Sequence, residues 1–193
     1  DADKTQYVRA ILDEIHRLDE IIRNLLNYAR PPHPQIGTCL LADLSNRVIQ
    51  LLSDEAGKKG IQIEVQDKLL HRSCRADGNQ LTQALLNIVL NGIQACKKND
   101  QIEIILSNED ADRKAYARID VIDTGTGIRP EIRNRLFEPF VTTKTTGTGL
   151  GLAISQQIIE EHHGKISCRS LDKGTQFSIR LPVNMQEPSV KVD

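Results

Sequence analysis

A regular apolar seam, stopped abruptly by prolines, most constrains how this chain can fold. Within residues 5–30, apolar side chains recur at alternating intervals of three and four residues, and charged residues fill much of the remainder. This spacing predicts one long helix with an a/d seam of about three heptads. The segment PPHP at 31–34 then ends the helix and predicts a stiff, extended linker. The seam consists of Val8, Ile11, Ile15, Leu18, Ile22 and Leu25.

A helix with such a seam must bury it against another helix. One possibility is packing on the helix's own domain. The proline-rich linker at 31–35 separates the helix from the rest of the chain, and this favours a bundle with another chain.

The remainder, 36–183, has the pattern of one α/β domain. Hairpin-like strands with interspersed helices predict a two-layer sandwich, in which a mixed, mostly antiparallel sheet carries helices on one face. Residues 184–193 are expected to form a disordered tail. Helices are expected at 42–58, 78–97 and 149–162, strands at 61–66, 101–107, 116–123, 165–170 and 175–182, and a turn-rich stretch at 124–148.

Composition narrows the function classes. The 193 residues suffice for one core plus an appendage, and a net charge of −1 gives no electrostatic case for nucleic acid or an anionic membrane. No apolar run approaches the roughly 20 residues of a membrane span, and no signal peptide is visible. The chain begins DADK, as expected of a fragment, and it could be the soluble part of a membrane protein.

The four cysteines are isolated in the sequence, without a C-x-x-C motif. This favours reduced thiols in a cytoplasmic domain over a disulfide framework or a zinc site. They are Cys39, Cys74, Cys96 and Cys168.

The helix at 78–97 carries amide side chains on one face and apolar side chains on most of the others. Because a helix that is apolar nearly all round is buried, these amides are expected to face a cavity. A satisfied polar network in the core is about as plausible as a site where an amide oxygen helps to hold Mg²⁺. The amides are Gln80, Gln83, Asn87, Asn91 and Gln94.

Two strands end on polar residues that share a face with core residues. Alternation places Asp123 on the same face as Ile119 and Val121, and it places Thr175 on the same face as Phe177. Asp123 either caps the following turn or accepts a hydrogen bond from a ligand, such as the exocyclic amine of a base. Thr175 alone would be an ordinary end of a strand, but beside Asp123 it becomes a second polar group at one pocket.

The stretch TTKTTGTGLGLAIS, residues 142–155, has glycines at alternate positions before a helical pattern. Its spacing fits neither the dinucleotide-binding fingerprint nor the P-loop. Free N–H groups at the start of a helix bind anions, and Lys144 would add a positive charge. The preceding LFEPFVTTK resembles a flexible flap that Leu136, Phe137, Phe140 and Val141 could hinge or anchor.

Taken in order, NIVLNGIQA, DTGTG, FEPF, GTGLGLAIS and GTQF resemble the conserved boxes of sensor histidine protein kinases. These kinases belong to the ATPase superfamily that also includes gyrase, Hsp90 and MutL. The resemblance covers 36–183, is strongest to the nitrogen-regulation branch, and implies a Bergerat-type ATP-binding fold.

The resemblance also implies roles for individual residues. Asn91 would coordinate Mg²⁺, Asp123 would bind the adenine amine with help from Thr175, and Lys144 would contact the phosphates. Gly125 and Gly127 would lie beneath the nucleotide, Phe137 and Phe140 would anchor the lid, and Gly147, Gly149 and Gly151 would surround the phosphates. Further residues expected to bind the nucleotide are Asn87, Ile128, Thr142, Thr143, Thr148 and Leu150.

The identity of residue 87 suggests whether the γ-phosphate of ATP is transferred or hydrolysed. Gyrase-type and MutL-type relatives carry a water-activating glutamate one helical turn before the metal asparagine, whereas an asparagine cannot act as a base. Asn87 and Lys144 are therefore expected to serve transfer of the γ-phosphate rather than its hydrolysis. A gyrase-like or MutL-like ATPase that closes a dimer, and a non-catalytic nucleotide-binding module, are the alternatives.

The phosphate acceptor is expected to lie outside this chain. No histidine has the neighbours of the family's phosphoacceptor motif, and His16 lacks both the adjacent acid and the proline. Residues 1–30 instead resemble the second helix of the dimerisation hairpin. The implied partners are the missing acceptor helix, a second copy of the full-length protein and a response regulator.

Overall fold

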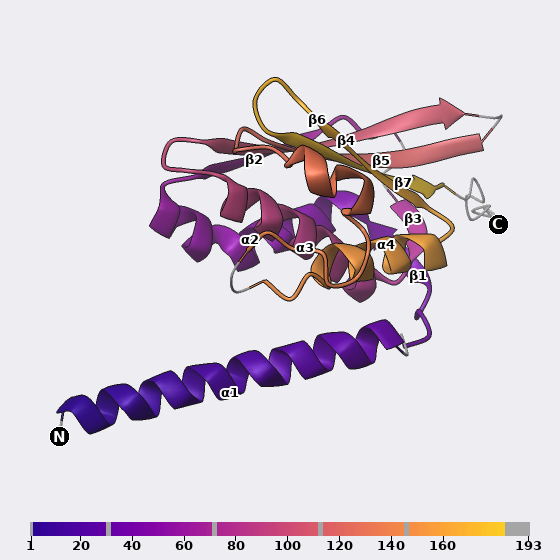
Figure 1. Cartoon of the computed structure of the whole chain (residues 1–193). Helices are drawn as coiled ribbons and strands as arrows, with labels where there is room; N and C mark the ends of the chain where they lie inside the picture. The colour runs from indigo at the N-terminus through magenta and orange to yellow at the C-terminus, as the bar shows by residue number, and fades with distance from the viewer. Residues whose placement is uncertain (1, 30–31, 71–72, 112–113, 145–146, 184–193) are drawn as a thin grey trace.

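The computed structural model describes residues 2–29, 32–70, 73–111, 114–144 and 147–183 (Figure 1). Its centre is a five-stranded sheet in the order β2-β4-β5-β7-β6. β2 is parallel to β4, and the other neighbouring strands are antiparallel. The strands are β2 (Gln62–Asp67), β4 (Gln101–Ala111), β5 (Lys114–Asp123), β6 (Lys165–Ser170) and β7 (Thr175–Pro182).

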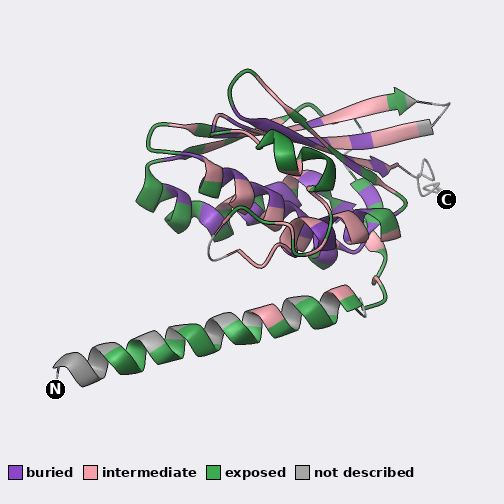
Figure 2. Ribbon diagram, in the orientation of Figure 1, coloured by how far each residue is buried: buried purple, intermediate pink, exposed green. Residues whose placement is uncertain are grey.

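Helices cover one face of this sheet, as predicted (Figure 1). Alternate side chains of β5, such as Ala117, Ile119 and Val121, are buried toward the helices, and the core lies between the two layers (Figure 2). The helices are α2 (Leu41–Lys59), α3 (Gly78–Ala95) and α4 (Gly151–Glu161), and a short 3₁₀ helix, η1 (Pro130–Arg135), lies within the turn-rich stretch.

A second, two-stranded sheet was not predicted. β1 (Gly37–Leu40) pairs antiparallel with β3 (Ser73–Ala76). Each strand has only four residues, which are too few for an alternation of apolar and polar residues to be recognised in the sequence. β4 and β5 also extend beyond the predicted 101–107 and 116–123, because they pair with each other past the point where apolar residues alternate.

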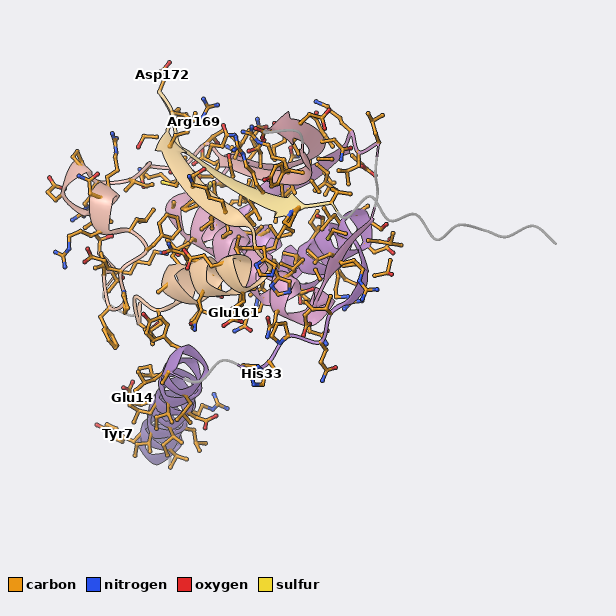
Figure 3. The ribbon with its side chains drawn as sticks, turned by 90° about the vertical axis from the view of Figure 1, so that its right-hand side faces the viewer. Tyr7, Glu14, His33, Glu161, Arg169 and Asp172 are labelled. Carbon is orange, nitrogen blue, oxygen red and sulfur yellow. The ribbon has the colours of Figure 1, made fainter. Side chains whose placement is uncertain are left out.

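The N-terminal helix α1 (Ala2–Ala29) lies along the helical side of the domain and contacts α4 (Figures 1 and 3). The six predicted seam residues are all exposed, from 43% at Leu25 to 60% at Ile11. The domain therefore does not bury the seam, and a bundle with another chain stays a prediction. The predicted disordered tail at 184–193 lies outside the described residues, as does the side chain of His16.

The linker does not stand free of the domain, because it is hydrogen-bonded to the start of α3. The backbone N–H of Gln35 donates to Asp77 Oδ2 at 2.7 Å, and Gln80 Nε2 donates to the carbonyl of Pro32 at 2.8 Å. Asp77 also caps α3 by accepting from the N–H groups of Asn79 and Gln80. The chain from α1 is thus attached to the helix that carries the predicted metal ligand.

Candidate functional site: a cavity between α3, the lid and α4

A cavity of about 400 Å³ opens between α3, the start of α4 and the segment 136–149, called the lid below. The described parts of the lid, 136–144 and 147–149, follow η1 and precede α4 in the chain, and Lys144 contacts α3. The predicted residues that line the cavity are Asn87, Asn91, Thr142, Thr143, Lys144, Gly147, Thr148, Gly149 and Gly151.

The amide face of α3 is divided between two tasks. Gln80 holds the linker, whereas Asn87, Asn91 and Gln94 line the cavity. Asn87 Nδ2 donates to the carbonyl of Gly151 at 3.1 Å, which ties α3 to the first residue of α4. Gln83 is not among the residues lining the cavity. The helical spacing correctly predicted a shared face but not this division.

Lys144 lies directly over the predicted metal ligand. Its Nζ donates to Asn91 Oδ1 at 2.6 Å and also contacts Gln94 Oε1. Burial lowers the pKa of Lys144, and the nearby charge of Lys59 lowers it further. The cation is thus held inside the cavity by neutral amides, where it can exchange its partners for an anion.

The lid is anchored by one of the two predicted phenylalanines. The Phe137 ring meets Phe177 edge-on, with centroids 6.4 Å apart and planes at 86°. The predicted anchoring by Phe140 is wrong, because its side chain is 63% exposed. Phe140 has a positive φ of 65°, and its N–H donates to the carbonyl of Gly149 at 3.0 Å, so its backbone rather than its ring fastens the lid.

The start of α4 has the features of an anion site. Leu150 precedes the helix, and no described side chain caps the N–H groups of the first turn. Those groups and the positive end of the helix dipole favour a negatively charged ligand. Because the helix begins at Gly151, which lines the cavity, these donors lie at the cavity wall.

Asp123 and Thr175 occupy directly opposite positions on β5 and β7, and each is only 3% exposed. Burial raises the pKa of Asp123, although the N–H of Gly125 and the backbone and hydroxyl of Thr175 donate to the carboxylate and oppose the shift. The predicted pair of polar groups is therefore formed, and it lies in the core of the domain.

This pair lies beside the cavity rather than in its wall. A Cβ on Gly92 would be 3.5 Å from Asp123 Cβ, so the carboxylate packs against α3 one residue from Asn91. The expected binding of adenine stays a prediction. The predicted residues that do not line the cavity are Asp123, Gly125, Gly127, Ile128, Phe137, Phe140, Leu150 and Thr175.

The structure gives a reason for glycine at position 125 that differs from the expected approach of a nucleotide. A Cβ there would lie 2.7 Å from the backbone of Ala95, and Thr126 N donates to the carbonyl of Ala95 at 3.2 Å. The space beside Gly125 is thus filled by the end of α3, because the turn after β5 must pass close to that helix.

Sequence reasoning did not single out four residues that line the cavity, Glu55, Leu90, Ile132 and Leu152, or the role of Gly174 beside Asp123. Glu55 of α2 lines the cavity, but an exposed glutamate on an amphipathic helix gives no signal. A Cβ on Gly174 would lie 1.8 Å from the carbonyl oxygen of Asp123, so this glycine permits the approach of the two strand ends. Its signal was the turn sequence DKGT before β7.

The residues present fit a magnesium ion accompanied by phosphates. Within the described ranges, no three His, Cys, Asp or Glu side chains gather as a metal site. Mg²⁺ usually takes one or two protein oxygens and completes its shell with water and substrate phosphates. Asn91 Oδ1 could supply such an oxygen once Lys144 has moved from it to the phosphates.

Comparison with known proteins agrees with this site. Residues 76–185 match the family described as histidine kinase-, DNA gyrase B- and HSP90-like ATPases. The chain is 36% identical over 179 residues to the sensor histidine kinase ZraS of Salmonella typhimurium, covering 92% of this chain and 38% of ZraS. It is 35% identical to the sensory histidine kinase/phosphatase NtrB of Proteus hauseri, covering 93% of this chain and 53% of NtrB.

Solved structures give the same result. Full-length ShkA in complex with AMPPNP superimposes with a TM-score of 0.79 at 28% identity, covering 94% of this chain and 39% of that one. Histidine kinase ThkA in complex with the response regulator TrrA has a TM-score of 0.76 at 28% identity, covering 92% and 51%.

The chain spans about two fifths of the length of ZraS and about half that of NtrB. No helix in the described part of the chain has the length and apolarity needed to cross a membrane. The family match covers the lid, the Asp123–Thr175 pair and every residue that lines the cavity except Glu55. The chain therefore belongs to the histidine kinase-, DNA gyrase B- and HSP90-like ATPases, and within them to the catalytic domains of sensor histidine kinases.

Proposed function

We propose that this domain binds Mg-ATP and transfers the γ-phosphate to a histidine on an acceptor helix outside the described chain. The observation that carries the proposal is the meeting of Asn91, Lys144 and the uncapped start of α4 around one cavity. An amide oxygen, a mobile cation and free N–H groups are the partners that a metal-bound triphosphate requires.

In the proposed complex, Lys144 leaves Asn91 and Gln94 and pairs with the phosphates. Asn91 Oδ1 then holds Mg²⁺, which would neutralise charge on the phosphates during transfer. The N–H groups at the start of α4 bind the remaining phosphate oxygens. Asp123 accepts from the adenine amine, and Thr175 orients its carboxylate.

Asn87 favours transfer over hydrolysis. Its amide nitrogen is engaged with the carbonyl of Gly151, and an amide cannot take a proton from water. Asn87 would therefore hold the start of α4 in place while an outside nucleophile approaches the phosphate. The absence of a carboxylate at this position argues against the alternative of a gyrase-like or MutL-like ATPase that closes a dimer.

The partners follow from the proposed reaction. α1 would be the second helix of a dimerisation hairpin, whose first helix carries the acceptor histidine in the same or the partner subunit of a homodimer. A cognate response regulator would then receive the phosphate on an aspartate, in a cytoplasmic two-component pathway. The similarity to ThkA, a histidine kinase solved in complex with a response regulator, supports this proposal.

Calorimetry of the isolated chain tests the site assignments. We expect Asn91→Ala to weaken Mg-ATP binding by at least about tenfold, while nucleotide binding without magnesium changes little, because only the metal contact is removed. Asp123→Asn should weaken binding of both ATP and ADP, because the amide presents a donor to the adenine amine.

Gln83→Ala is the matched control, since Gln83 lies on the same helix but does not line the cavity. Unchanged affinity in both Asn91→Ala and Asp123→Asn would exclude this mode of nucleotide binding. Substantial ATP turnover by the chain alone would instead favour the dimer-closing ATPase, and binding without any transfer would favour the non-catalytic module.

A further inference from the structure

Cys39 and Cys74 face each other across the small β1–β3 sheet. They are directly paired in the antiparallel register, between the pairs Thr38–Arg75 and Leu40–Ser73. Opposite residues of antiparallel strands have Cα atoms about 4.5 or 5.5 Å apart, and both separations lie within the range spanned by disulfides. The two cysteines, which are isolated in the sequence, are therefore a pair in space.

The two thiols are also in chemical contact. Both cysteines are buried and unoxidised, and their side chains are hydrogen-bonded to each other. The hydrogen bond from Cys74 lowers the pKa of Cys39 despite its burial, with help from the charge of Arg47. The same hydrogen bond, together with burial, raises the pKa of Cys74. These opposite directions favour the thiolate at Cys39 over the thiolate at Cys74.

The other two cysteines lack these features. Cys96 is buried at the end of α3, and burial raises its pKa to about 11. Cys168 is half-buried on β6 and lies opposite Phe177 rather than another cysteine. Cys168 is more exposed than Cys39. If exposure alone decided reactivity, Cys168 would be oxidised first, whereas pairing predicts that Cys39 and Cys74 are oxidised first.

We propose that Cys39 and Cys74 form a thiol oxidation site that small peroxides convert to a disulfide. The Cys39 thiolate attacks the peroxide oxygen, which gives a sulfenic acid and releases hydroxide, or water once protonated. The Cys74 sulfur then attacks the Cys39 sulfur, and the sulfenic oxygen leaves as water with the Cys74 proton. Two thiols and one hydrogen peroxide give one disulfide and two waters.

The place of this pair gives the disulfide a structural consequence. β1 begins two residues after Gln35, and Cys74 lies three residues before Asp77, the residue that joins the linker to α3. Cys39 lies between the exposed residues Thr38 and Leu40, while its own side chain and that of Cys74 are buried in the hydrophobic core. Oxidation would covalently fix the attachment of the linker beside the helix that carries Asn91.

Mass spectrometry after peroxide treatment of the native chain tests the proposal. Free thiols are alkylated, the chain is digested, and peptides are mapped. We expect a Cys39–Cys74 disulfide that dithiothreitol reverses, formed before Cys96 or Cys168 is oxidised. Cys39 and Cys74 recovered as alkylated thiols, or native disulfides that involve Cys168, would overturn it. The same treatment in urea should give mixed pairings, because the fold no longer selects one.

Single substitutions test the assigned order of the two sulfurs. In Cys74→Ser the sulfenic acid at Cys39 has no partner, and dimedone should label it at least about tenfold more than it labels Cys74 in Cys39→Ser. Equal labelling, or the reverse order, would contradict the assignment. Cys168→Ser is the matched control and should form the disulfide as the wild type does. This test does not depend on nucleotide binding, so its failure would leave the proposed function standing.

Discussion

At the scale of single residues, Asp123 contributes both to the packing of the fold and to the proposed binding of the nucleotide. Its carboxylate is 3% exposed, packs against α3, and is held by the N–H of Gly125 and by Thr175. Burial nevertheless raises its pKa, so the folded state bears a cost when the group ionises. We expect adenine binding to use this same charge.

The raised pKa predicts how stability varies with pH. Between the ordinary value of 3.8 and the raised folded value, the folded state binds the proton more tightly than the unfolded state does. The free energy of unfolding therefore falls as pH rises through this window, and Asp123→Asn should remove that fall. Urea unfolding from acid to neutral pH measures it.

Asp100→Asn provides a second variant for this pH series, and it should also reduce the Asp123 effect, because the charge of Asp100 helps to raise the pKa of Asp123. The Lys173 hydrogen bond lowers the pKa of Asp100 to about 2, so its contribution to stability is present above pH 3.8 and is lost as pH falls from 3.8 toward about 2. Its effect therefore appears below the Asp123 window. An unchanged pH dependence in Asp123→Asn would contradict the assigned burial.

Gly174, which directly precedes β7, lies against the backbone of Asp123. A methyl group there would meet the carbonyl oxygen of Asp123 at 1.8 Å, and the residue has a φ of +86°. We expect Gly174→Ala to lower the free energy of unfolding by at least about 2 kcal/mol. Gly37→Ala, where nothing lies within 4 Å of the added atom, should change it by less than about 0.5 kcal/mol. Equal effects in urea unfolding would refute the close approach.

At the scale of secondary-structure elements, the long periodic segments were predictable and the short or irregular ones were not. The interval of three or four residues identified α1 and α3, and alternation identified β5 and β7. The patterns of α3, β5 and β7 reflect buried faces, whereas the seam of α1 is exposed. β1 and β3 have too few residues for a pattern, and only their pairing reveals that Cys39 meets Cys74.

The lid shows a second limit of sequence reasoning. The apolar character of Phe137 and Phe140 suggested that both would pack, but Phe140 has a positive φ and an exposed side chain. Backbone conformation at a single turn residue is set by its hydrogen bonds, here to Gly149, and leaves no mark in the hydrophobic pattern. The hydrogen bond from Gln80 to the carbonyl of Pro32 could not be predicted either, because it also leaves no mark in the hydrophobic pattern.

The junction of the linker and α3 can be separated into its two functions. Asp77 Oδ1 caps α3, whereas Oδ2 accepts from Gln35. Asp77→Ala should lose both and cost about 1–2 kcal/mol of stability, whereas Asp77→Asn should keep the cap and cost less. Both variants should speed hydrogen exchange at the Gln35 amide. If Asn destabilised the chain as much as Ala does, the division of the carboxylate would be wrong.

At the scale of the whole molecule, the α/β domain and α1 differ in whether their apolar residues are buried within the chain. The α/β domain buries its own core, and Asn87 and Lys144 hold α3, α4 and the lid around one cavity. α1 leaves its apolar seam exposed and is attached to the domain through the linker and α4. The proposed transfer reaction requires a domain that can present a phosphate and a helix that can pack against partner helices, and these two features are compatible with it.

The measurement that tests this account most directly is transfer of radiolabelled γ-phosphate from ATP to a separately supplied two-helix hairpin that carries the acceptor histidine. The account predicts magnesium-dependent label on the hairpin, bound through an acid-labile phosphohistidine, and loss of this label in Asn91→Ala and Lys144→Ala. Release of the label as inorganic phosphate, with the hairpin unlabelled, would contradict it.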